Sequence, residues 1–157
     1  MDNFDKFYKK ALNFLSFRPR SEKELKDYLS RKKADDLSIQ KIIQNLKENK
    51  FLDDKEFAIW LVEQRTTFRP RAERLIKMEL KQKGIDAELI DEVFKDLVNS
   101  DLEKALSLGQ KRMERYAKEK DKRKIYEKLG RFLASRGFNW DIIKEVIDRV
   151  LPKEYNK

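Results

Sequence analysis

Two Arg-Pro-Arg sequences are the residues of this chain best suited to binding chemistry. They are Arg18-Pro19-Arg20 and Arg69-Pro70-Arg71, and each comes directly before a predicted helix. Proline stiffens the approach to the helix, and the two guanidinium groups flank free backbone N–H groups at the positive end of the helix dipole. Phosphate or carboxylate would bind well there, and the fork of donors on arginine suits both. We expect these positions to bind a partner; the alternative is a solvated face balanced by nearby glutamates.

Basic side chains also outnumber acidic ones in the chain as a whole. There are 38 Lys and Arg against 29 Asp and Glu, a net charge of +9. Residues 1–52, 53–100 and 101–157 have net charges of +5, −2 and +6. The basic ends would be drawn to a polyanion or to an acidic protein surface. The candidate residues for binding a partner or DNA are Arg18, Arg20, Arg69, Arg71, Arg74, Lys122, Arg123 and Lys124.

Residues that could catalyse a reaction are scarce. The chain has no cysteine and no histidine, which excludes disulfides, zinc fingers and a cysteine nucleophile and removes the commonest general base. The sequence also shows no glycine-rich phosphate loop, no paired-carboxylate spacing and no Ser-Lys dyad. We therefore expect a protein that is not an enzyme and that holds no cofactor and no metal.

Two acidic and two aromatic residues have a structural and a functional interpretation. Asp53 and Asp54 resemble an acidic metal pair, but helix capping explains them with fewer assumptions. Trp60 and Trp140 lie beside apolar neighbours on predicted helices. Packing in a core or between repeats is favoured for both tryptophans over base stacking.

The elements that must position these residues are helices. Four glycines and three prolines leave little material for turns, and apolar residues recur three and four positions apart, as in Ile39, Ile42, Ile43 and Leu46. No apolar run approaches the ~18 residues of a membrane span. The N-terminus is too charged for a secretory signal. The sequence therefore predicts an all-α protein of the cytoplasm with no membrane partner.

An internal repeat organises these helices. Residues 17–21 align with residues 68–72 at an offset of 51, which holds for the next 25 residues, and a further shift of 53 gives a third copy. An upstream helix matches at an offset of 47, from Ala11 to Ala58 to Ala105. The aligned core positions include Leu25, Ile76 and Leu129; Leu29, Leu80 and Leu133; Ile39, Ile90 and Ile143; and Ile42, Val93 and Val146.

The repeat predicts the architecture of the chain. We expect three tandem three-helix repeats, over 1–52, 53–100 and 101–157, stacked into an elongated, curved rod. Such a shape suits a binding protein better than an enzyme with a deep pocket, and we expect a monomer. The predicted helices cover 4–16, 21–33, 38–49, 54–67, 71–83, 87–98, 101–118, 123–136 and 140–151.

Capping signals mark the predicted helix ends. They are two capping boxes (Ser21 with Glu24, Ser100 with Glu103), a similar pair (Asp53 with Glu56), two N-caps (Asp86, Asn139) and two C′ glycines that can close Schellman motifs (Gly84, Gly137). Lys33 stands at the glycine position in the first repeat, so its turn is less well specified.

Three-helix units suggest a helix-turn-helix protein whose third helix enters the major groove. The charges argue against this, because the exposed face of the third helix is acidic, with Asp91 and Glu92 in the second repeat and Asp141 and Asp148 in the third. Phosphates repel such a face, so we do not expect base readout by these helices, while non-specific backbone contact stays open.

The repeat resembles the RecX family of bacterial recombination regulators over essentially the whole chain. Four stretches carry the resemblance, in order: residues 11–29, with Arg18-Pro19-Arg20-Ser21; Phe51-Leu52-Asp53-Asp54 with Phe57-Ala58; Glu79-Leu80-Lys81-Gln82-Lys83-Gly84-Ile85; and Phe132-Leu133-Ala134-Ser135-Arg136-Gly137-Phe138. Ala72 and Lys33 depart from the family pattern, in which glycine is common, and these departures concern local turn geometry.

The resemblance implies a partner and an activity. RecX proteins bind the RecA recombinase, lie along the helical groove of the RecA–DNA filament, and suppress its ATPase, strand-exchange and co-protease activities. The function that this implies is non-enzymatic regulation of DNA repair, the SOS response and homologous recombination. Single- or double-stranded DNA is a further partner that the basic patches would contact.

Two other functions stay open from the residues alone. A general architectural DNA-binding protein would bind naked DNA with a steep salt dependence and without RecA. A nuclease would cleave DNA with a metal ion held by Asp53 and Asp54.

Overall fold

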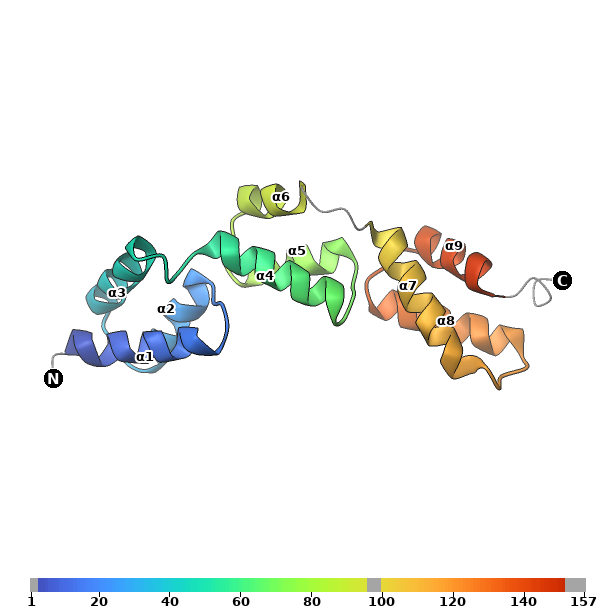
Figure 1. Cartoon of the computed structure of the whole chain (residues 1–157), viewed down its shortest axis with the longest axis horizontal. Coiled ribbons are helices and arrows are strands. Elements are labelled where there is room, and N and C mark those ends of the chain that lie inside the picture. Colours follow the sequence, from blue (N-terminus) through green and yellow to red (C-terminus); the bar gives the residue numbers. More distant parts are fainter. Residues whose placement is uncertain (1–2, 96–99, 152–157) are drawn as a thin grey trace. The chain divides into compact units, whose positions relative to one another are not determined.

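The computed structural model describes residues 3–95 and 100–151, and these fold into α-helices with no strand among them (Figure 1). The helices follow one another in three groups of three, which confirms the predicted all-α class and the three-helix repeats. They are α1 (Asn3–Phe17), α2 (Glu22–Arg31), α3 (Asp36–Glu48), α4 (Asp54–Thr67), α5 (Glu73–Gln82), α6 (Ala87–Lys95), α7 (Asp101–Met113), α8 (Lys122–Ser135) and α9 (Trp140–Val150), with a 3-10 turn η1 (Glu114–Tyr116) after α7.

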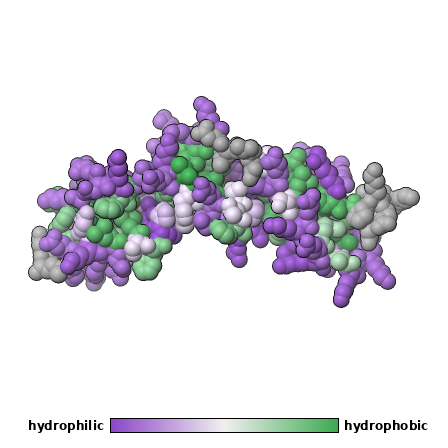
Figure 2. All heavy atoms as spheres, viewed as in Figure 1, coloured by the Kyte–Doolittle hydropathy of each residue, from purple (hydrophilic) through white to green (hydrophobic). Residues whose placement is uncertain are grey.

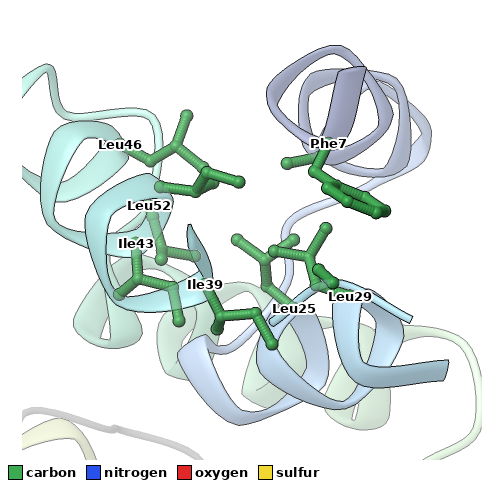
Figure 3. Close-up of a cluster of buried hydrophobic side chains, with 10 residues drawn as sticks. Phe7, Leu25, Leu29, Ile39, Ile43, Leu46 and Leu52 are labelled. Carbon is green, nitrogen blue, oxygen red and sulfur yellow. The ribbon is translucent and has the colours of Figure 1, made fainter. Parts of the chain in front are cut away.

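The first repeat has its own hydrophobic core. Figure 3 shows Phe7 of α1, Leu25 and Leu29 of α2, and Ile39 and Leu46 of α3 pointing toward one another. Each helix supplies residues spaced three or four apart, so one apolar stripe per helix faces the others. A fully buried leucine contributes about 1.5–3 kcal/mol, and Leu25, Leu29 and Leu46 are fully buried in this core.

The aligned core positions are buried in every repeat. The twelve residues in the four aligned sets are each at most 8% exposed. The third repeat forms a second cluster, which Ala72 extends from the start of α5. That cluster consists of Ala72, Ala105, Ile125, Leu129, Leu133, Phe138, Ile143, Val146, Ile147 and Leu151. The repeat read from the sequence is thus a repeat of core positions.

The chain forms two compact units whose border crosses the second repeat. One unit contains residues 1–62 and 79–96, and the other contains residues 63–78 and 97–157. The first unit therefore includes the start of α4 and the end of α5, and the second includes the end of α4 and the start of α5. On the face drawn in Figure 2, hydrophilic residues cover much of the surface around smaller apolar patches.

The predicted start signals are present in the structure. Ser21 and Glu24 form a complete capping box at α2. At α7 the Ser100 side chain accepts a hydrogen bond from the Glu103 N–H, which is one of the two bonds of the predicted capping box. Asp86 accepts one from the N–H of Glu88 at 2.9 Å, and Asn139 accepts one from Ile142 N–H at 3.0 Å. Side-chain oxygens thus satisfy amide donors that the first turn of a helix leaves open.

The predicted glycine turns are also confirmed. Gly84 and Gly137 have φ of +81° and +89°, and each closes a Schellman motif. Lys33 closes the same motif, with φ of +69°, by donating to Ser30 O while Ala34 donates to Leu29 O. The first repeat therefore makes the same turn, with a side chain in a conformation that favours glycine.

One predicted helix is too long. The sequence predicts a helix over 101–118, but α7 ends at Met113 and continues only as the 3-10 turn η1. The Glu114 N–H donates to the carbonyls of Lys111 and Arg112, which tightens the last turn. The end of the helix predicted over 87–98 lies outside the described residues. No helix among the described residues is long and apolar enough to cross a membrane.

Candidate functional site

The middle helices α2 and α5 begin where one repeat meets the next. The Glu22 N–H donates to Asp54 Oδ1 at 2.8 Å, and the Glu73 N–H donates to Asp101 Oδ1 at 2.9 Å. We name these two places the first and the second junction. At each of them an aspartate from the following repeat already binds a backbone N–H group that was expected to receive an external phosphate or carboxylate. The chain itself supplies a carboxylate to each helix start.

Arg18 is bound within the first junction. Its guanidinium donates to the Glu24 carboxylate through both terminal nitrogens, and its Cζ lies 5.4 Å from the Trp60 ring centroid and 6.0 Å from that of Phe57. Lys83 also approaches Glu24, with Nζ 3.4 Å from Oε2. The arginine therefore links the repeats through an ion pair and cation–π contacts.

Glu24 is the carboxylate that balances the first junction. Its side chain is only 12% exposed. Burial disfavours its ionisation, but hydrogen bonds from Arg18 and the Ser21 N–H, with the charges of Arg18 and Lys83, outweigh burial and lower the pKa of Glu24. Glu24 is therefore a carboxylate at neutral pH and neutralises part of the positive charge around it.

Arg20 packs within the first repeat. Its Cζ lies 3.8 Å from the Phe14 ring centroid and its Nε donates to Phe14 O at 3.2 Å. Phe14 in turn stacks on Tyr28 with the ring centroids 4.1 Å apart. Burial, and then the charge of Arg18, lower the pKa of Arg20, while Glu24 opposes the shift. The guanidinium is thus one layer of a stack.

The backbone at the second junction is held by three further hydrogen bonds. Ala72 N–H donates to Arg136 O at 2.9 Å, and Lys104 Nζ, on a side chain only 7% exposed, donates to Arg71 O at 3.0 Å. Arg74 Nε donates to Gly137 O at 2.9 Å. The bonds to Arg136 O and Gly137 O hold the start of α5 against the turn after α8, and the bond from Lys104 ties the segment before α5 to α7. Arg74, a candidate binding residue, is used in this way within the chain.

Four arginines lie together at the second junction. Arg112 and Arg136 both lie over the Phe132 ring, with Cζ 4.2 Å and 5.2 Å from its centroid. Burial, and then the positive charges of Arg69, Arg71 and Arg112, lower the pKa of Arg136. Arg112 Nε is buried without a hydrogen-bond partner in the part of the chain that the structure describes. We name Arg69, Arg71, Arg112 and Arg136 the arginine cluster.

Only Arg69 and Arg71 of this cluster are predicted from the sequence. Arg112 and Arg136 were not among the candidate residues, although their spacing carries a signal. Arg112 occupies the position of Arg65 at the offset of 47, and Arg136 occupies that of Lys83 at the offset of 53. A basic residue is thus kept at both positions in successive repeats.

The remaining candidates lie at the start of α8. The Arg123 N–H donates to Asp121 Oδ1 at 2.9 Å, so Asp121 caps the helix. Lys122 is half-buried, and Arg123 and Lys124 are exposed. These three cations stand at the positive end of the helix dipole, where they are unfavourable to the helix itself. They form a second basic surface.

The acidic pair has a structural role in the described residues. Asp53 Oδ1 accepts from the N–H groups of Lys55 and Glu56 at 2.9 Å and 3.4 Å, so it caps α4. Asp54 accepts from Glu22, and burial raises its pKa in spite of that bond. Among residues 3–95 and 100–151, no group of three or more acidic side chains is placed to hold a metal ion.

The two tryptophans differ in their surroundings. Trp60 is half-buried, packs against Phe57 with the ring centroids 6.1 Å apart, and receives Arg18. Trp140 is 56% exposed and makes an edge contact with Tyr126. Packing therefore accounts for Trp60. More than half of Trp140 faces solvent, so Trp140 does not pack in a core, and its packing between repeats stays a prediction.

Comparisons with known proteins agree over most of each repeat. Models of the first, second and third three-helix domains of RecX match residues 8–46, 53–93 and 99–147. The regulatory protein RecX of Clostridium tetani is 38% identical over 153 residues, which cover 96% of this chain and 69% of that protein. The regulatory protein RecX of Clostridioides difficile is also 38% identical, over 90% of this chain and 66% of that protein.

A solved structure gives the same relationship. The crystal structure of RecX from Lactobacillus salivarius superposes with a TM-score of 0.74 at 29% sequence identity, and the match covers 95% of this chain and 97% of that one. The three domain models match in chain order, and two relatives are each 38% identical to this chain. Both results point to the same family. The chain belongs to the RecX family of regulatory proteins.

Proposed function

We propose that this chain is a non-enzymatic regulator that binds the RecA recombinase filament on DNA and inhibits its ATPase, strand-exchange and co-protease activities. The observation that carries the proposal is membership of the RecX family, whose three three-helix domains all match. The relatives named above are regulatory proteins. We infer that the chain acts in the cytoplasm as a monomer and regulates DNA repair and the SOS response.

The repeats suggest how a filament would be recognised. A RecA filament presents the same surface at regular intervals, and three related modules in one chain can each contact a successive subunit. Linking weak contacts in this way raises overall affinity without any new contact, provided that the modules engage together. Basic side chains at the second junction and at the start of α8 supply groups that would meet acidic side chains or DNA phosphates.

A RecA ATPase titration on single-stranded DNA tests the proposal. We expect ATP hydrolysis to fall as the chain is added, with most of the inhibition reached near stoichiometric protein. Bovine serum albumin at the same concentration controls for non-specific effects. Unchanged hydrolysis at stoichiometric protein would contradict the proposal.

The arginine cluster favours one alternative, a general DNA-binding architectural protein. Such a protein would bind naked DNA whether or not RecA is present, with a steep dependence on salt concentration. Filter binding to naked DNA, followed by ATPase assays in the same buffer, separates the two functions. Tight DNA binding with no effect on RecA would favour the alternative.

A further inference from the structure

The first repeat has a groove between its first and third helices, which we name the α1–α3 groove. Its volume is about 500 Å³. Its lining combines two apolar side chains, Phe4 of α1 and Leu37 of α3, with the side-chain amides of Gln40, Gln44 and Asn45. Leu37 is 60% exposed. A surface that is apolar at one place and rich in hydrogen-bonding groups beside it is typical of binding sites in proteins.

The floor of the α1–α3 groove is held in place by contacts within the repeat. The Phe4 ring stacks on the Tyr8 ring with the centroids 5.7 Å apart. The Tyr8 hydroxyl donates to Asn45 Oδ1 at 2.8 Å, and Asn49 Nδ2 donates to the same oxygen at 3.0 Å. These bonds join α1 to α3 before any partner arrives, so less conformational entropy is lost when the groove is filled.

The lining of the α1–α3 groove has no net charge, although the chain as a whole has a net charge of +9. Its two charged residues, Lys41 and Glu48, have opposite signs. Glu48 also accepts a hydrogen bond from Gln44 Nε2 at 2.8 Å. Binding to nucleic acid depends on several cations that neutralise phosphates, and this groove offers only one. The centres of protein–protein interfaces are instead depleted of charge, so the groove fits a protein partner.

The other two repeats differ from the first at these positions. At the repeat offsets, Leu37 corresponds to Glu88 and to Asp141, and both of these acidic residues are exposed. Gln40 corresponds to Asp91 in the second repeat. Because burial of a carboxylate without a partner is costly, Glu88 and Asp141 favour contact with water at these places. An exposed apolar residue at this position is therefore particular to the first repeat.

We propose that the α1–α3 groove is the docking site for an uncharged segment on the surface of a RecA subunit. An apolar side chain of that segment packs on Leu37 and Phe4, and its backbone groups form hydrogen bonds with Gln40 and Gln44. Side-chain amides both donate and accept, so they can pair with backbone N–H and C=O groups alike. RecA as the occupant rests on the proposed function. The first repeat then anchors the chain on its partner, and the other two repeats make different contacts.

Substitutions of Leu37 in the full chain test this docking site, with co-sedimentation on RecA filaments as the measure of affinity. Leu37→Glu introduces the residue that the second repeat has at this position. We expect it to weaken binding about 10- to 100-fold, the loss that corresponds to one buried leucine side chain. The melting temperature should stay close to that of the wild type, because a glutamate in the first turn of α3 is favourable to the helix dipole.

Two further variants separate the apolar contact from the charge. Leu37→Gln removes the apolar side chain without changing the net charge and should weaken binding by about 5-fold or more. Leu37→Met keeps an apolar side chain of similar volume and should stay within about 3-fold of the wild type. Asn13→Asp changes the net charge as Leu37→Glu does, at an exposed position of α1, and should also stay within about 3-fold.

A labelled thymidine oligonucleotide without RecA shows whether these variants act through DNA. Fluorescence anisotropy should give the same DNA affinity for Leu37→Glu as for the wild type. A parallel loss of DNA binding and filament binding would overturn the assignment to a protein partner. Equal losses for Leu37→Glu and Asn13→Asp would also overturn the proposal, because net charge would then explain both.

The wild type distinguishes failure of this inference from failure of the proposed function. If the wild type binds the filament and Leu37→Glu or Leu37→Gln binds equally well, the docking site is wrong and the proposed function stands. If the wild type itself does not co-sediment with RecA filaments, the proposed function is contradicted and RecA is not the occupant of the groove.

Discussion

The Asp54 carboxylate accepts a hydrogen bond from the backbone N–H of Glu22 at 2.8 Å, so the first residue of α4 caps the start of α2 in the preceding repeat. Asp101 and Glu73 repeat this relationship. The cap recurs because the aspartates are 47 residues apart and the helix starts are 51 residues apart, so both partners are copied with the repeat. Each of these bonds joins neighbouring repeats as well as capping a helix.

Removing this cap should weaken the fold. We expect Asp54→Ala to lower the free energy of unfolding by about 1–2 kcal/mol, as for other lost N-terminal caps, because the Glu22 N–H loses its acceptor. Asp54→Asn keeps an acceptor oxygen and should cost less. Urea unfolding followed by circular dichroism measures both. Equal losses for the two variants would show that the hydrogen bond is not the cause.

A glycine at position 33 should stabilise the first repeat. Lys33 has φ of +69°, in the left-handed region where Gly84 and Gly137 complete the equivalent turns. We expect Lys33→Gly to raise the free energy of unfolding by about 0.5–1 kcal/mol, because relief of the backbone strain exceeds the entropy that glycine adds to the unfolded chain. Thermal and urea unfolding both report this change.

Two controls isolate the backbone effect. Lys33→Ala removes the long side chain but keeps the strained φ, so its stability should stay close to that of the wild type. Gly137→Ala should be strongly destabilising, by about 2 kcal/mol or more, because it combines positive φ with a Cβ only 2.4 Å from Leu75. A stabilising effect of Lys33→Ala equal to that of Lys33→Gly would contradict the explanation.

Glu24 should make stability depend on pH in the acid range. The pKa of Glu24 is lower in the folded protein than the ordinary value of 4.5, through Arg18, Ser21 and Lys83 acting against burial. A lowered carboxyl pKa contributes stability that is fully present above the unfolded value and is lost as the pH falls through the folded value. Urea midpoints from pH 7 to pH 3 should therefore fall less steeply for Glu24→Gln than for the wild type.

Asp54 should change the pH dependence of stability in the opposite direction. Burial, only partly offset by the bond from the Glu22 N–H, raises the pKa of Asp54 above 3.8, so the folded state binds this proton more tightly than the unfolded state does. Protonation of Asp54 then favours the folded state as the pH falls. Asp54→Asn lacks this contribution, and its midpoint should fall more steeply on acidification than that of the wild type. Parallel pH profiles for Asp54→Asn and Glu24→Gln would contradict both assignments.

A glycine inside α7 should resist substitution although it lies in a helix. A Cβ built on Gly109 would lie 2.7 Å from Val146 Cγ1 of α9, too close for two carbon atoms. Overpacking of this kind costs about 1–3 kcal/mol, which exceeds the ~1 kcal/mol that alanine gains over glycine in a helix. Gly109→Ala should therefore destabilise the protein in urea unfolding.

A double-mutant cycle checks that the contact is the cause. Val146→Ala removes the methyl groups that the new Cβ would meet, at the cost of a cavity. The double variant should be more stable than the sum of the two single effects predicts, by about 0.5–3 kcal/mol, as for other residues in direct contact. If the two changes in unfolding free energy are simply additive, the contact with Val146 is not what makes Gly109→Ala destabilising.

The sequence predicted the architecture more completely than the candidate site. Core positions such as Leu25 and Ile76 follow from helical periodicity and a fixed offset, both of which are local properties of the sequence. The arginine cluster depends on which side chains meet where two repeats join, and no spacing states that Arg112 and Arg136 share the Phe132 ring. The alignment of repeats places Leu75 at the position of Glu24. Only the structure shows that Glu24 forms an ion pair with Arg18, so that the two positions differ in charge.

The two Arg-Pro-Arg sequences should differ in their importance for binding the RecA filament. Arg18 and Arg20 are held by Glu24 and Phe14 within the chain, whereas Arg69 is exposed in the turn that follows α4. We expect R69A/R71A to reduce co-sedimentation with RecA filaments by about 10-fold in affinity, equivalent to about 1.4 kcal/mol. R18A/R20A carries the same change in charge and should lower the melting temperature while leaving most of the co-sedimentation. If R18A/R20A instead lost binding to the same extent while remaining folded, the difference between the junctions would have no bearing on the partner.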